Sequence, residues 1–380
     1  MSAPNIARGH KGPLSVVTAM SSCRRWQCLK AAILPPTGWA IGVFVLGGHR
    51  VFRSSVVLAA IICIAATLAE AAGVQFFDVP ADGSGPNLTG AVWYPCATPP
   101  QEIKYENRVI VGAKDCEVVG SKLPIIVMSH GRTAWFGSHY DTAAALADAG
   151  YIVAAANHPG DNSFDHSRTD DLSIFVERPV DTNRLLNFML STWPDAPKID
   201  SERIGLFGFS MGGYTGLVVI GGIPDLRKEV PGCEGNRLRA CEQLRKNEVA
   251  AGPSVRDRRI KAAIIVDPGP GIFFPTENLK SINVPIQLWS SDPKLSGQYD
   301  SGCCGLGIRN RLPSKPDFHL ATGAIHVSFL APCSPEEKEA PEFSRICTDA
   351  PGFDRDAFHK DFNSNVLTFL RKSLSKNEKP

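Results

Sequence analysis

Short apolar runs alternate with amphipathic segments along the chain from Val74 onward. The runs have the length of buried strands, and the segments between them space their apolar residues as one face of a helix does. We expect strands at residues 90–94, 123–129, 151–156, 203–209, 260–266 and 285–289, and helices at 140–149, 178–191 and 211–220. Because the strands are apolar on both faces and helices separate them, the pattern predicts an α/β fold with a mostly parallel central sheet and helices on both faces.

Two segments interrupt this alternation. Residues 221–259 are polar and charged and lie between an expected helix and the next strand, where a small cap insertion would fit. Residues 300–316 are rich in glycine, cysteine and arginine and are expected to form a loop. We therefore expect one α/β domain over residues 73–380, with 221–259 as its cap.

Residues 1–72 have a different pattern. An apolar run at Val56–Leu68 follows Arg53, and Ala69 and Ala71 after it have the spacing that a signal peptidase requires. A basic flank, an apolar core and a small-residue cleavage site are typical of a secretory signal peptide. The run is shorter than the roughly 20 apolar residues that span a bilayer, so membrane anchoring is the weaker interpretation. We expect cleavage near Ala71 and export to the periplasm or the exterior.

The residues before Val51 show no clear pattern. A signal peptide normally stands at the start of a protein. We therefore hypothesise that translation begins downstream of Met1, at Met20 or near Val51.

The chain has 11 cysteines, eight of which follow the expected cleavage site. An even number of cysteines in an exported chain favours disulfides. The near-neighbour pairs that would close short loops are Cys96–Cys116, Cys233–Cys241 and Cys333–Cys347, while Cys303 and Cys304 are adjacent in sequence. No C-x-x-C pair or cysteine–histidine cluster favours zinc, and we expect no metal site.

The composition is that of an ordinary globular protein, with 43% hydrophobic and 21% charged residues. The 40 basic and 38 acidic residues are interspersed, and no long basic block occurs. A nucleic-acid partner is therefore not expected. Nothing in the composition predicts the oligomeric state.

The clearest motif is G-x-S-x-G, formed by Gly208-Phe209-Ser210-Met211-Gly212 between an expected strand and an expected helix. This spacing lets a serine occupy a sharp strand-to-helix turn, because the flanking glycines leave room for neighbouring segments to approach closely. The N-terminal N–H groups of the following helix then point toward the serine. We predict that Ser210 is a catalytic nucleophile.

A serine hydroxyl needs a base to take its proton. His326 follows every expected strand and lies in a short loop, residues 323–329, that enters an apolar segment. His319 is the alternative, but its surroundings resemble a strand edge, which favours a solvated or packing role. His359 lies on an expected terminal amphipathic helix and is interpreted as a surface residue. We therefore predict His326 as the base.

Two aspartates compete to orient this histidine. Both follow Ser210 and precede His326, which gives the chain order nucleophile, acid, histidine that this type of motif uses. Asp267 directly ends an apolar strand and is followed by a tight Pro-Gly turn, whereas Asp292 follows the next strand after two serines. We prefer Asp267 and keep Asp292 as the alternative.

An oxyanion is stabilised by two backbone N–H donors aimed at the developing charge. One donor is expected from Met211, which follows the nucleophile, and the other from Arg132, in the loop after the strand at 123–129. Gly131 lets that loop turn, and His130 is expected to brace it by hydrogen bonding.

Together these motifs resemble the dienelactone-hydrolase-like and platelet-activating-factor acetylhydrolase-like branch of the α/β hydrolases, with polyester-degrading cutinases as further relatives. The resemblance covers residues 74–370 and is carried by Ser129-His130-Gly131, Asn157-His158-Pro159-Gly160, GFSMGG and His326. It implies an α/β-hydrolase fold, and in acetylhydrolase-like members the acid follows the strand that Asp267 ends here. Dienelactone hydrolases use a cysteine where this chain has Ser210, which sets dienelactone aside as a substrate.

The expected activity is hydrolysis of carboxylic esters, lipid-like or small, through an acyl-enzyme. Ser210 attacks, His326 moves the protons, and the N–H groups of Met211 and Arg132 hold the oxyanion. This chemistry requires no metal or organic cofactor. The same residues would also serve an acyltransferase or a peptidase, because a fold does not fix the reaction. A non-catalytic binding module on this scaffold is the third alternative, although it would be expected to have lost one of the three residue types.

Overall fold

The computed structural model describes residues 71–227, 233, 238–248, 255–296 and 305–375. The chain divides into two compact units, Met1–Ala65 and Ala66–Pro380, and all the described residues belong to the second. The expected signal peptide, the alternative start sites and the Cys303–Cys304 pair lie outside the described residues.

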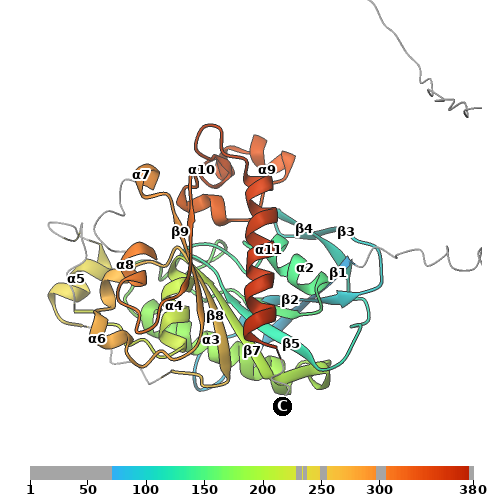
Figure 1. Cartoon of the computed structure of the whole chain (residues 1–380), viewed down its shortest axis with the longest axis horizontal. Helices are drawn as coiled ribbons and strands as arrows, with labels where there is room; N and C mark the ends of the chain where they lie inside the picture. The colour runs from blue at the N-terminus through green and yellow to red at the C-terminus, as the bar shows by residue number, and fades with distance from the viewer. Residues whose placement is uncertain (1–70, 228–232, 234–237, 249–254, 297–304, 376–380) are drawn as a thin grey trace, which may run out of the picture. The chain divides into compact units, whose positions relative to one another are not determined.

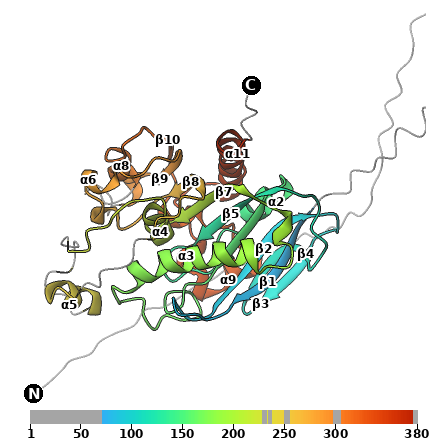
Figure 2. The same cartoon turned by 90° about the horizontal axis from the view of Figure 1, so that it is seen from below.

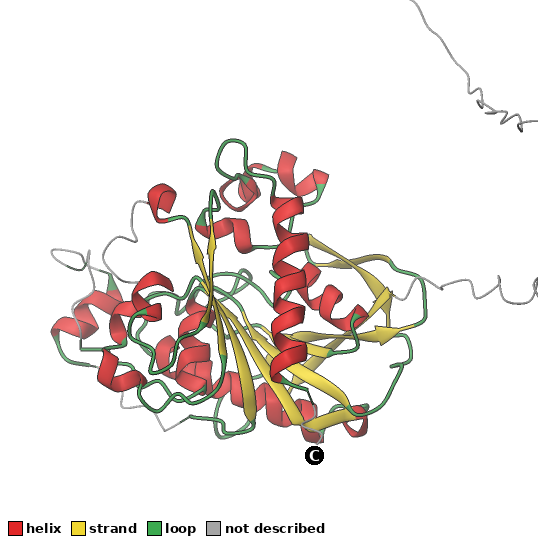
Figure 3. Cartoon of the chain, in the orientation of Figure 1, coloured by secondary structure: helices red, strands yellow, loops and turns green. Residues whose placement is uncertain are grey.

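Ten strands of the described residues form one mixed sheet (Figures 1 and 3), in the order β10-β9-β8-β7-β5-β6-β2-β1-β4-β3. All neighbours from β6 through β5, β7, β8 and β9 to β10 pair in parallel, whereas β2 runs antiparallel to β6 and to β1. The strands are β1 Ala71–Val79, β2 Leu88–Cys96, β3 Gln101–Tyr105, β4 Arg108–Lys114, β5 Leu123–Ser129, β6 Ile152–Ala156, β7 Ile199–Phe209, β8 Ile260–Val266, β9 Ile286–Ser291 and β10 Asp317–Ala321.

Helices cover both faces of this sheet, with α3 and α11 on opposite sides (Figure 2). The α-helices are α2 Tyr140–Asp148, α3 Ile174–Ser191, α4 Met211–Val219, α5 Arg239–Arg245, α6 Thr276–Leu279, α7 Pro293–Ser296, α8 Gly305–Arg309, α9 Pro335–Glu339, α10 Ser344–Cys347 and α11 Arg355–Ser373. Short 3₁₀ turns are η1 Ala196–Lys198, η2 Gly271–Phe273, η3 His326–Phe329 and η4 Pro341–Phe343.

Successive side chains of a strand point to opposite faces of the sheet. The central strands are buried on both faces because helices cover each of them. In β5, Ile125 and Val127 join the core that α3 and α4 cover, whereas Ile126 and Met128 join the core that α2 and α11 cover. The fold class predicted from the unbroken apolar runs is therefore confirmed. The expected strands at 123–129 and 260–266 match β5 and β8.

Four strands were not among those expected from the sequence: β10 at one edge of the sheet, and β1, β4 and β3 in this order at the other. At the latter edge β3 and β4 form an antiparallel hairpin. Several side chains of the hairpin strands are exposed, and these include charged residues such as Glu102 and Lys104. Half-exposed strands of this kind carry no continuous apolar run, which is the signal that identified the central strands.

Helix α3 begins at Ile174, one turn earlier than the expected start at Arg178. Pro179 lies inside the helix and has no N–H to donate to the carbonyl of Phe175, four residues before it. The Tyr214 hydroxyl from α4 donates to this Phe175 carbonyl instead, at 3.3 Å. The helix therefore continues through a proline because a neighbouring helix supplies the missing donor.

Helix α11 corrects a second expectation. His359 was interpreted as a surface residue, but its side chain is 3% exposed and faces α2. The helix is amphipathic as expected, and its inner face carries this histidine among aromatic residues such as Phe362. Helical periodicity alone did not reveal the polar partners that allow a histidine to be buried.

Three disulfides are present among the described residues. They are Cys96–Cys116, Cys233–Cys241 and Cys333–Cys347, the three near-neighbour pairs expected from the sequence. Disulfides persist in oxidising compartments, so the covalent structure favours an environment outside the cytosol. Within the described ranges, no helix combines the length and the apolar character needed to cross a bilayer.

The described part of the 221–259 insertion packs against the segment before α3. Gln243 of α5 accepts a hydrogen bond from the Leu172 N–H at 2.9 Å and donates to Asp171 at 3.1 Å. Arg239 forms an ion pair with the same Asp171 at 2.7 Å. The insertion is therefore tied to the loop that follows β6.

The role of Tyr214 at the proline of α3 leads to a test in a double-mutant cycle. Tyr214→Phe leaves the partly buried Phe175 carbonyl without this donor, so we expect the free energy of unfolding to fall by about 1 kcal/mol. In a Pro179→Ala background the alanine N–H can donate to the Phe175 carbonyl, so Tyr214→Phe should lower the free energy of unfolding by less. Urea unfolding of the four proteins measures both costs, and equal costs in the two backgrounds would contradict this role for Tyr214.

Candidate active site

Ser210 occupies the turn between β7, which ends at Phe209, and α4, which begins at Met211. Its backbone has φ 55° and ψ −117°, a conformation that L-residues rarely adopt. Three backbone hydrogen bonds hold it: the Ser210 N–H donates to the Val266 carbonyl at 2.9 Å, and the Ser210 carbonyl accepts from the Gly269 N–H at 3.0 Å and from the Tyr214 N–H at 3.1 Å. The turn is thus fixed by the neighbouring strand β8 and the loop that follows it.

The glycines of the motif are required by close packing. A Cβ atom on Gly208 would lie 2.2 Å from the Gly212 carbonyl oxygen, and one on Gly212 would lie 1.8 Å from the Ser129 carbonyl oxygen. Neither position has room for a side chain. The G-x-S-x-G spacing is therefore explained by the distance between α4, β7 and the end of β5.

The structure brings Ser210, His326 and Asp267 into one hydrogen-bonded chain. His326 Nε2 lies 2.9 Å from Ser210 Oγ, and His326 Nδ1 lies 2.7 Å from Asp267 Oδ2. The Asp267 side chain is 1% exposed and that of His326 is 27% exposed. Because the carboxylate accepts from Nδ1–H, the imidazole Nε2 can accept the serine proton.

The carboxylate of Asp267 is oriented by Ser291 at the end of β9. The Ser291 N–H donates to Asp267 Oδ1 at 3.1 Å and its hydroxyl donates to Oδ2 at 2.8 Å. The alternative, Asp292, instead accepts from the backbone N–H groups of Gly323 and Lys294, and these hydrogen bonds lower its pKa. Of the two aspartates, the geometry thus places Asp267 against His326 and Asp292 in a turn.

The turn η3 carries His326 at its first position. The Phe209 ring stacks on the imidazole with centroids 4.7 Å apart and an interplanar angle of 28°. Within the turn, the Ser328 hydroxyl accepts from the Ile325 N–H at 3.1 Å and donates to Asp349 at 2.6 Å. His319 packs elsewhere, stacked on Trp289 with centroids 4.2 Å apart.

The loop after β5 lies beside the nucleophile. A Cβ atom on Gly131 would be 3.4 Å from Ser210 Cβ, so the loop and the serine are in direct contact. Among the residues that the structure describes, no hydrogen bond uses the backbone N–H of Arg132 or Met211. The structure thus leaves both expected donors without an acceptor in the described part of the chain, and it places Gly131, which precedes Arg132, in contact with Ser210.

A buried ion pair holds both ends of this loop. Arg178 of α3 binds Asp161 Oδ2 at 2.8 Å and also donates to the His130 carbonyl, while Asp161 Oδ1 accepts from the Thr133 N–H at 3.2 Å. Burial lowers the pKa of Arg178 to about 10, with Asp161 opposing the shift, so the guanidinium remains charged at neutral pH. The loop from His130 to Thr133 is thus fixed on either side of Gly131 and Arg132.

His130 and His158 add a second support. His130 Nδ1 donates to the Gly131 carbonyl at 2.7 Å and its Nε2 accepts from the His158 N–H at 3.2 Å, which is the bracing role expected from the sequence. Burial, aided by the Arg178 charge, holds the pKa of His130 well below its ordinary value. The neutral imidazole can therefore donate from one nitrogen and accept at the other.

A second Ser-His-Asp chain lies beneath the loop. Ser129 Oγ is 2.9 Å from His158 Nε2, and His158 Nδ1 is 3.0 Å from Asp181 Oδ2. Ser129 is 1% exposed, so substrate cannot reach it and the chain fixes the end of β5. Sequence reasoning missed Arg178 and Asp181, although charged residues spaced by three on the inner face of an expected helix are a signal of buried polar contacts.

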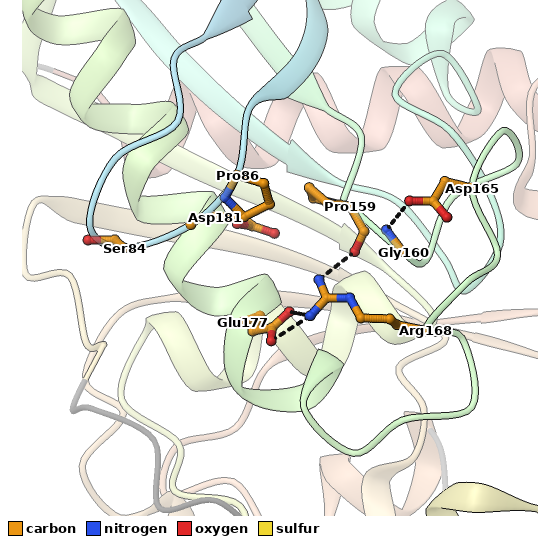
Figure 4. A pocket seen from close by; sticks show the side chains of 9 residues that line it. Ser84, Pro86, Pro159, Gly160, Asp165, Arg168, Glu177 and Asp181 are labelled. Carbon is orange, nitrogen blue, oxygen red and sulfur yellow. Dashed lines mark hydrogen bonds and ion pairs between the residues drawn. The ribbon is translucent and has the colours of Figure 1, made fainter.

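Asp181 also borders a pocket of about 390 Å³ (Figure 4). Arg168 lies in its wall, paired with Glu177 at 2.5 Å and bonded to the Pro159 carbonyl at 3.0 Å. Burial raises the pKa of Asp181 to about 7, against the opposing charge of Arg184. The lining residues are Ser84, Gly85, Pro86, Pro159, Gly160, Asp165, Arg168, Glu177 and Asp181. None of Ser210, His326 and Asp267 borders this pocket, which is separate from the serine site.

Two ion pairs of α3 provide a matched test of the loop support. The side chains of Arg178 and Asp161 are 1% and 0% exposed, whereas those of Arg168 and Glu177 are 32% and 38% exposed. Asp161→Asn leaves a buried guanidinium without its counterion, and we expect a loss of about 3–5 kcal/mol in unfolding free energy. Glu177→Gln should cost no more than about 1 kcal/mol. Chemical denaturation measures both, and similar costs would contradict the importance of the buried pair.

No model of a known protein family matches the sequence, and no curated protein matches it. Solved structures do resemble the fold. A ferulic acid esterase from Streptomyces cinnamoneus superposes with a TM-score of 0.52 at 16% sequence identity, over 83% of this chain and 93% of that one. An acylaminoacyl peptidase from Pyrococcus horikoshii gives a TM-score of 0.46 at 13% identity, over 82% of this chain and 43% of that one.

At this level of identity the resemblance concerns architecture. The similarity to the esterase extends over most of both chains. The parallel strands flanked by helices, the antiparallel β2 and the strand-to-helix turn at Ser210 belong to the same architecture. The chain therefore has the α/β-hydrolase fold.

Proposed function

We propose that this chain is an exported serine hydrolase that cleaves carboxylic esters through an acyl-enzyme. The observation that carries the proposal is the hydrogen-bonded chain in which His326 bridges Ser210 Oγ at 2.9 Å and Asp267 at 2.7 Å. A nucleophile, a base within hydrogen-bond reach and a group that orients the base are the requirements of covalent acyl transfer.

In the first half-reaction Ser210 Oγ attacks the ester carbonyl carbon while His326 Nε2 takes the hydroxyl proton. The carbonyl oxygen becomes an oxyanion, which the N–H groups of Met211 and Arg132 stabilise. The carbon–oxygen bond to the alcohol then breaks, and His326 gives its proton to the leaving alkoxide. The product is an acyl ester of Ser210 and a free alcohol.

In the second half-reaction water replaces the alcohol. His326 takes a proton from water as it attacks the acyl carbon, and the second tetrahedral intermediate collapses to release the acid and restore the serine hydroxyl. Asp267 stabilises the imidazolium that forms in both halves. Because Asp267 is 1% exposed, its attraction to the charged ring is little screened by solvent.

The ester class is supported by the motifs that resemble dienelactone-hydrolase-like and acetylhydrolase-like enzymes, with a serine at position 210. We propose lipid-like or small acyl esters as substrates. We also propose that the insertion influences the acyl chain length that the site accepts. This is supported by the bond of Gln243 to the loop before α3, which follows β6 at the carboxyl edge of the sheet.

Export is supported by the three disulfides and by the apolar run at Val56–Leu68 before the domain. Cleavage near Ala71 is compatible with the fold. Ala72 pairs with Pro95 in the β1–β2 ladder, so a mature chain beginning there would retain the rest of β1. We propose that the folded domain is the mature secreted form.

The first test uses p-nitrophenyl esters of increasing acyl length with the mature protein and two variants. Ser210→Ala should lower kcat by on the order of 10⁴ to 10⁶ while leaving the melting temperature close to that of the unchanged protein. Ser191→Ala, an exposed serine at the end of α3, is the control and should turn over normally.

Product analysis in this assay separates the related reactions. Added acceptor alcohols that divert the acyl group to new esters would indicate an acyltransferase, and faster cleavage of the matching p-nitroanilides would indicate a peptidase. Undiminished ester turnover by Ser210→Ala would refute the proposal.

The two aspartates give a second test of the site. Asp267→Asn should lower kcat by on the order of 10³ to 10⁴, because an amide at this position can no longer stabilise the imidazolium. Asp292→Asn should leave kcat nearly unchanged, since its carboxylate bonds to backbone groups of Gly323 and Lys294. Steady-state kinetics of both variants measure this, and the reverse ranking would reassign the acid to Asp292.

A further inference from the structure

His359 on α11 makes two short hydrogen bonds in a nearly water-free position. Its side chain is 3% exposed, its Nδ1 lies 2.7 Å from Asp141 Oδ2 of α2, and its Nε2 lies 2.9 Å from the Ser328 carbonyl oxygen. The two partners come from different parts of the chain. His359 therefore connects α2 to the turn η3.

Both partners are acceptors. A backbone carbonyl can only accept, so His359 Nε2 must carry a hydrogen. Asp141 Oδ2 also accepts from the Asn363 amide nitrogen at 3.1 Å, and the Thr142 hydroxyl fixes that amide by donating to its oxygen at 2.7 Å. An ionised Asp141 can only accept, so beside it His359 Nδ1 carries a hydrogen as well. With donors required at both nitrogens, the ring that fits this site is an imidazolium.

The charged groups around the ring agree with this assignment. Burial acts to lower the pKa of His359, but the Asp141 carboxylate outweighs it through charge and hydrogen bonding, and the pKa is raised. Burial likewise acts to raise the pKa of Asp141, and His359 outweighs it, so that pKa is lowered. Burial lowers the pKa of His139, at the start of α2, to about 4, which leaves that ring neutral. Arg355 opposes the charge on His359 from the same helix but is paired with Asp349 at 2.9 Å.

The Ser328 carbonyl belongs to the turn that carries His326. This turn is held at its hydroxyl side by the Ser328–Asp349 hydrogen bond and at its carbonyl side by His359. His326 occupies its first position, 2.9 Å from the nucleophile. A shift of the turn would therefore change the distance between the imidazole and Ser210 Oγ.

We propose that His359, as a buried imidazolium, is a positioning residue for His326, and that loss of its proton in alkaline solution displaces the turn and slows turnover. The proposal rests on the hydrolase function proposed above. The neutral ring keeps its Nδ1–H on Asp141, because the carboxylate is the stronger acceptor. The lone pair of its Nε2 then faces the lone pairs of the Ser328 carbonyl oxygen. The hydrogen bond between these two atoms is lost and they repel each other.

The kinetic test is the pH profile of kcat on a p-nitrophenyl ester. The unchanged protein should have an alkaline limb, where His359 loses its proton. His359→Gln should lower the plateau by up to about 10²-fold through misplacement of the base. It should also lack the alkaline limb, because glutamine does not titrate.

Two further variants sharpen this test. Asp141→Asn removes the charge that raises the His359 pKa, so the alkaline limb should move to lower pH. His319→Gln removes a histidine that is stacked on Trp289, away from the turn, and should keep the alkaline limb. An alkaline limb that is unchanged in both His359→Gln and Asp141→Asn would overturn the positioning role.

Two measurements do not depend on turnover. Ring ¹⁵N NMR at about pH 6.5, the ordinary histidine pKa, should show a histidine that is mainly protonated at both nitrogens and is missing from His359→Gln. A mainly singly protonated His359 at that pH would overturn the proposal. Since the folded pKa is raised, the stabilisation by His359 is fully present below about pH 6.5, the ordinary histidine pKa, and is lost as pH rises through the folded value. The difference in unfolding free energy between the unchanged protein and His359→Gln should therefore become smaller as the pH rises.

The outcomes separate the two proposals. Absence of ester turnover in the unchanged protein would refute the hydrolase function, whatever the NMR result. An active enzyme whose alkaline limb persists without His359 would leave that function intact and refute the positioning role alone.

Discussion

The strained turn at Ser210 is the constraint on which the rest of the site depends. Its backbone angles of φ 55° and ψ −117° cost on the order of 1–3 kcal/mol for a residue other than glycine. Such a conformation persists only where its surroundings determine it. Here the turn is hydrogen-bonded to Val266 and Gly269, and close packing around Gly208 and Gly212 leaves no room for the chain to relax.

Once the turn is fixed, the sheet brings the remaining groups to it. Strands β5, β7 and β8 are parallel neighbours, so the residues that follow them meet at one edge. The loop His130–Thr133, Ser210 and Asp267 follow these three strands in that spatial order. Only His326 arrives from a turn further along the chain, and its position therefore needs separate support.

Buried charge provides that support on both sides of the site. The Arg178–Asp161 pair, 1% and 0% exposed, fixes the loop His130–Thr133, and the His359–Asp141 pair holds the turn that carries His326. Buried ion pairs contribute little net stability, but removing one partner is costly, so they specify geometry strongly. The groups of the site are thus positioned by buried polar contacts from α2, α3 and α11.

The sequence predicted those parts of the structure whose signals are local. Strands β5 and β8 have unbroken apolar runs, and Ser210 lies in a motif whose glycines are required by close packing. The hairpin β3–β4 was missed because its exposed residues break the apolar pattern. The expected start of α3 was one turn too late, because the hydroxyl that bonds the carbonyl left free by Pro179 comes from Tyr214 on another helix. His359 was taken for a surface residue because Asp141 and Ser328, which make its burial possible, lie far from it in the chain.

The central claim is that the hydroxyl at the strained turn is chemically activated, and fluorophosphonate labelling followed by peptide mass mapping tests it most directly. The account predicts one phosphonyl group per folded chain, attached to Ser210, with labelling lost in Ser210→Ala and strongly slowed in His326→Ala. A folded protein that takes up no label, or that carries it on a different serine, would contradict the account.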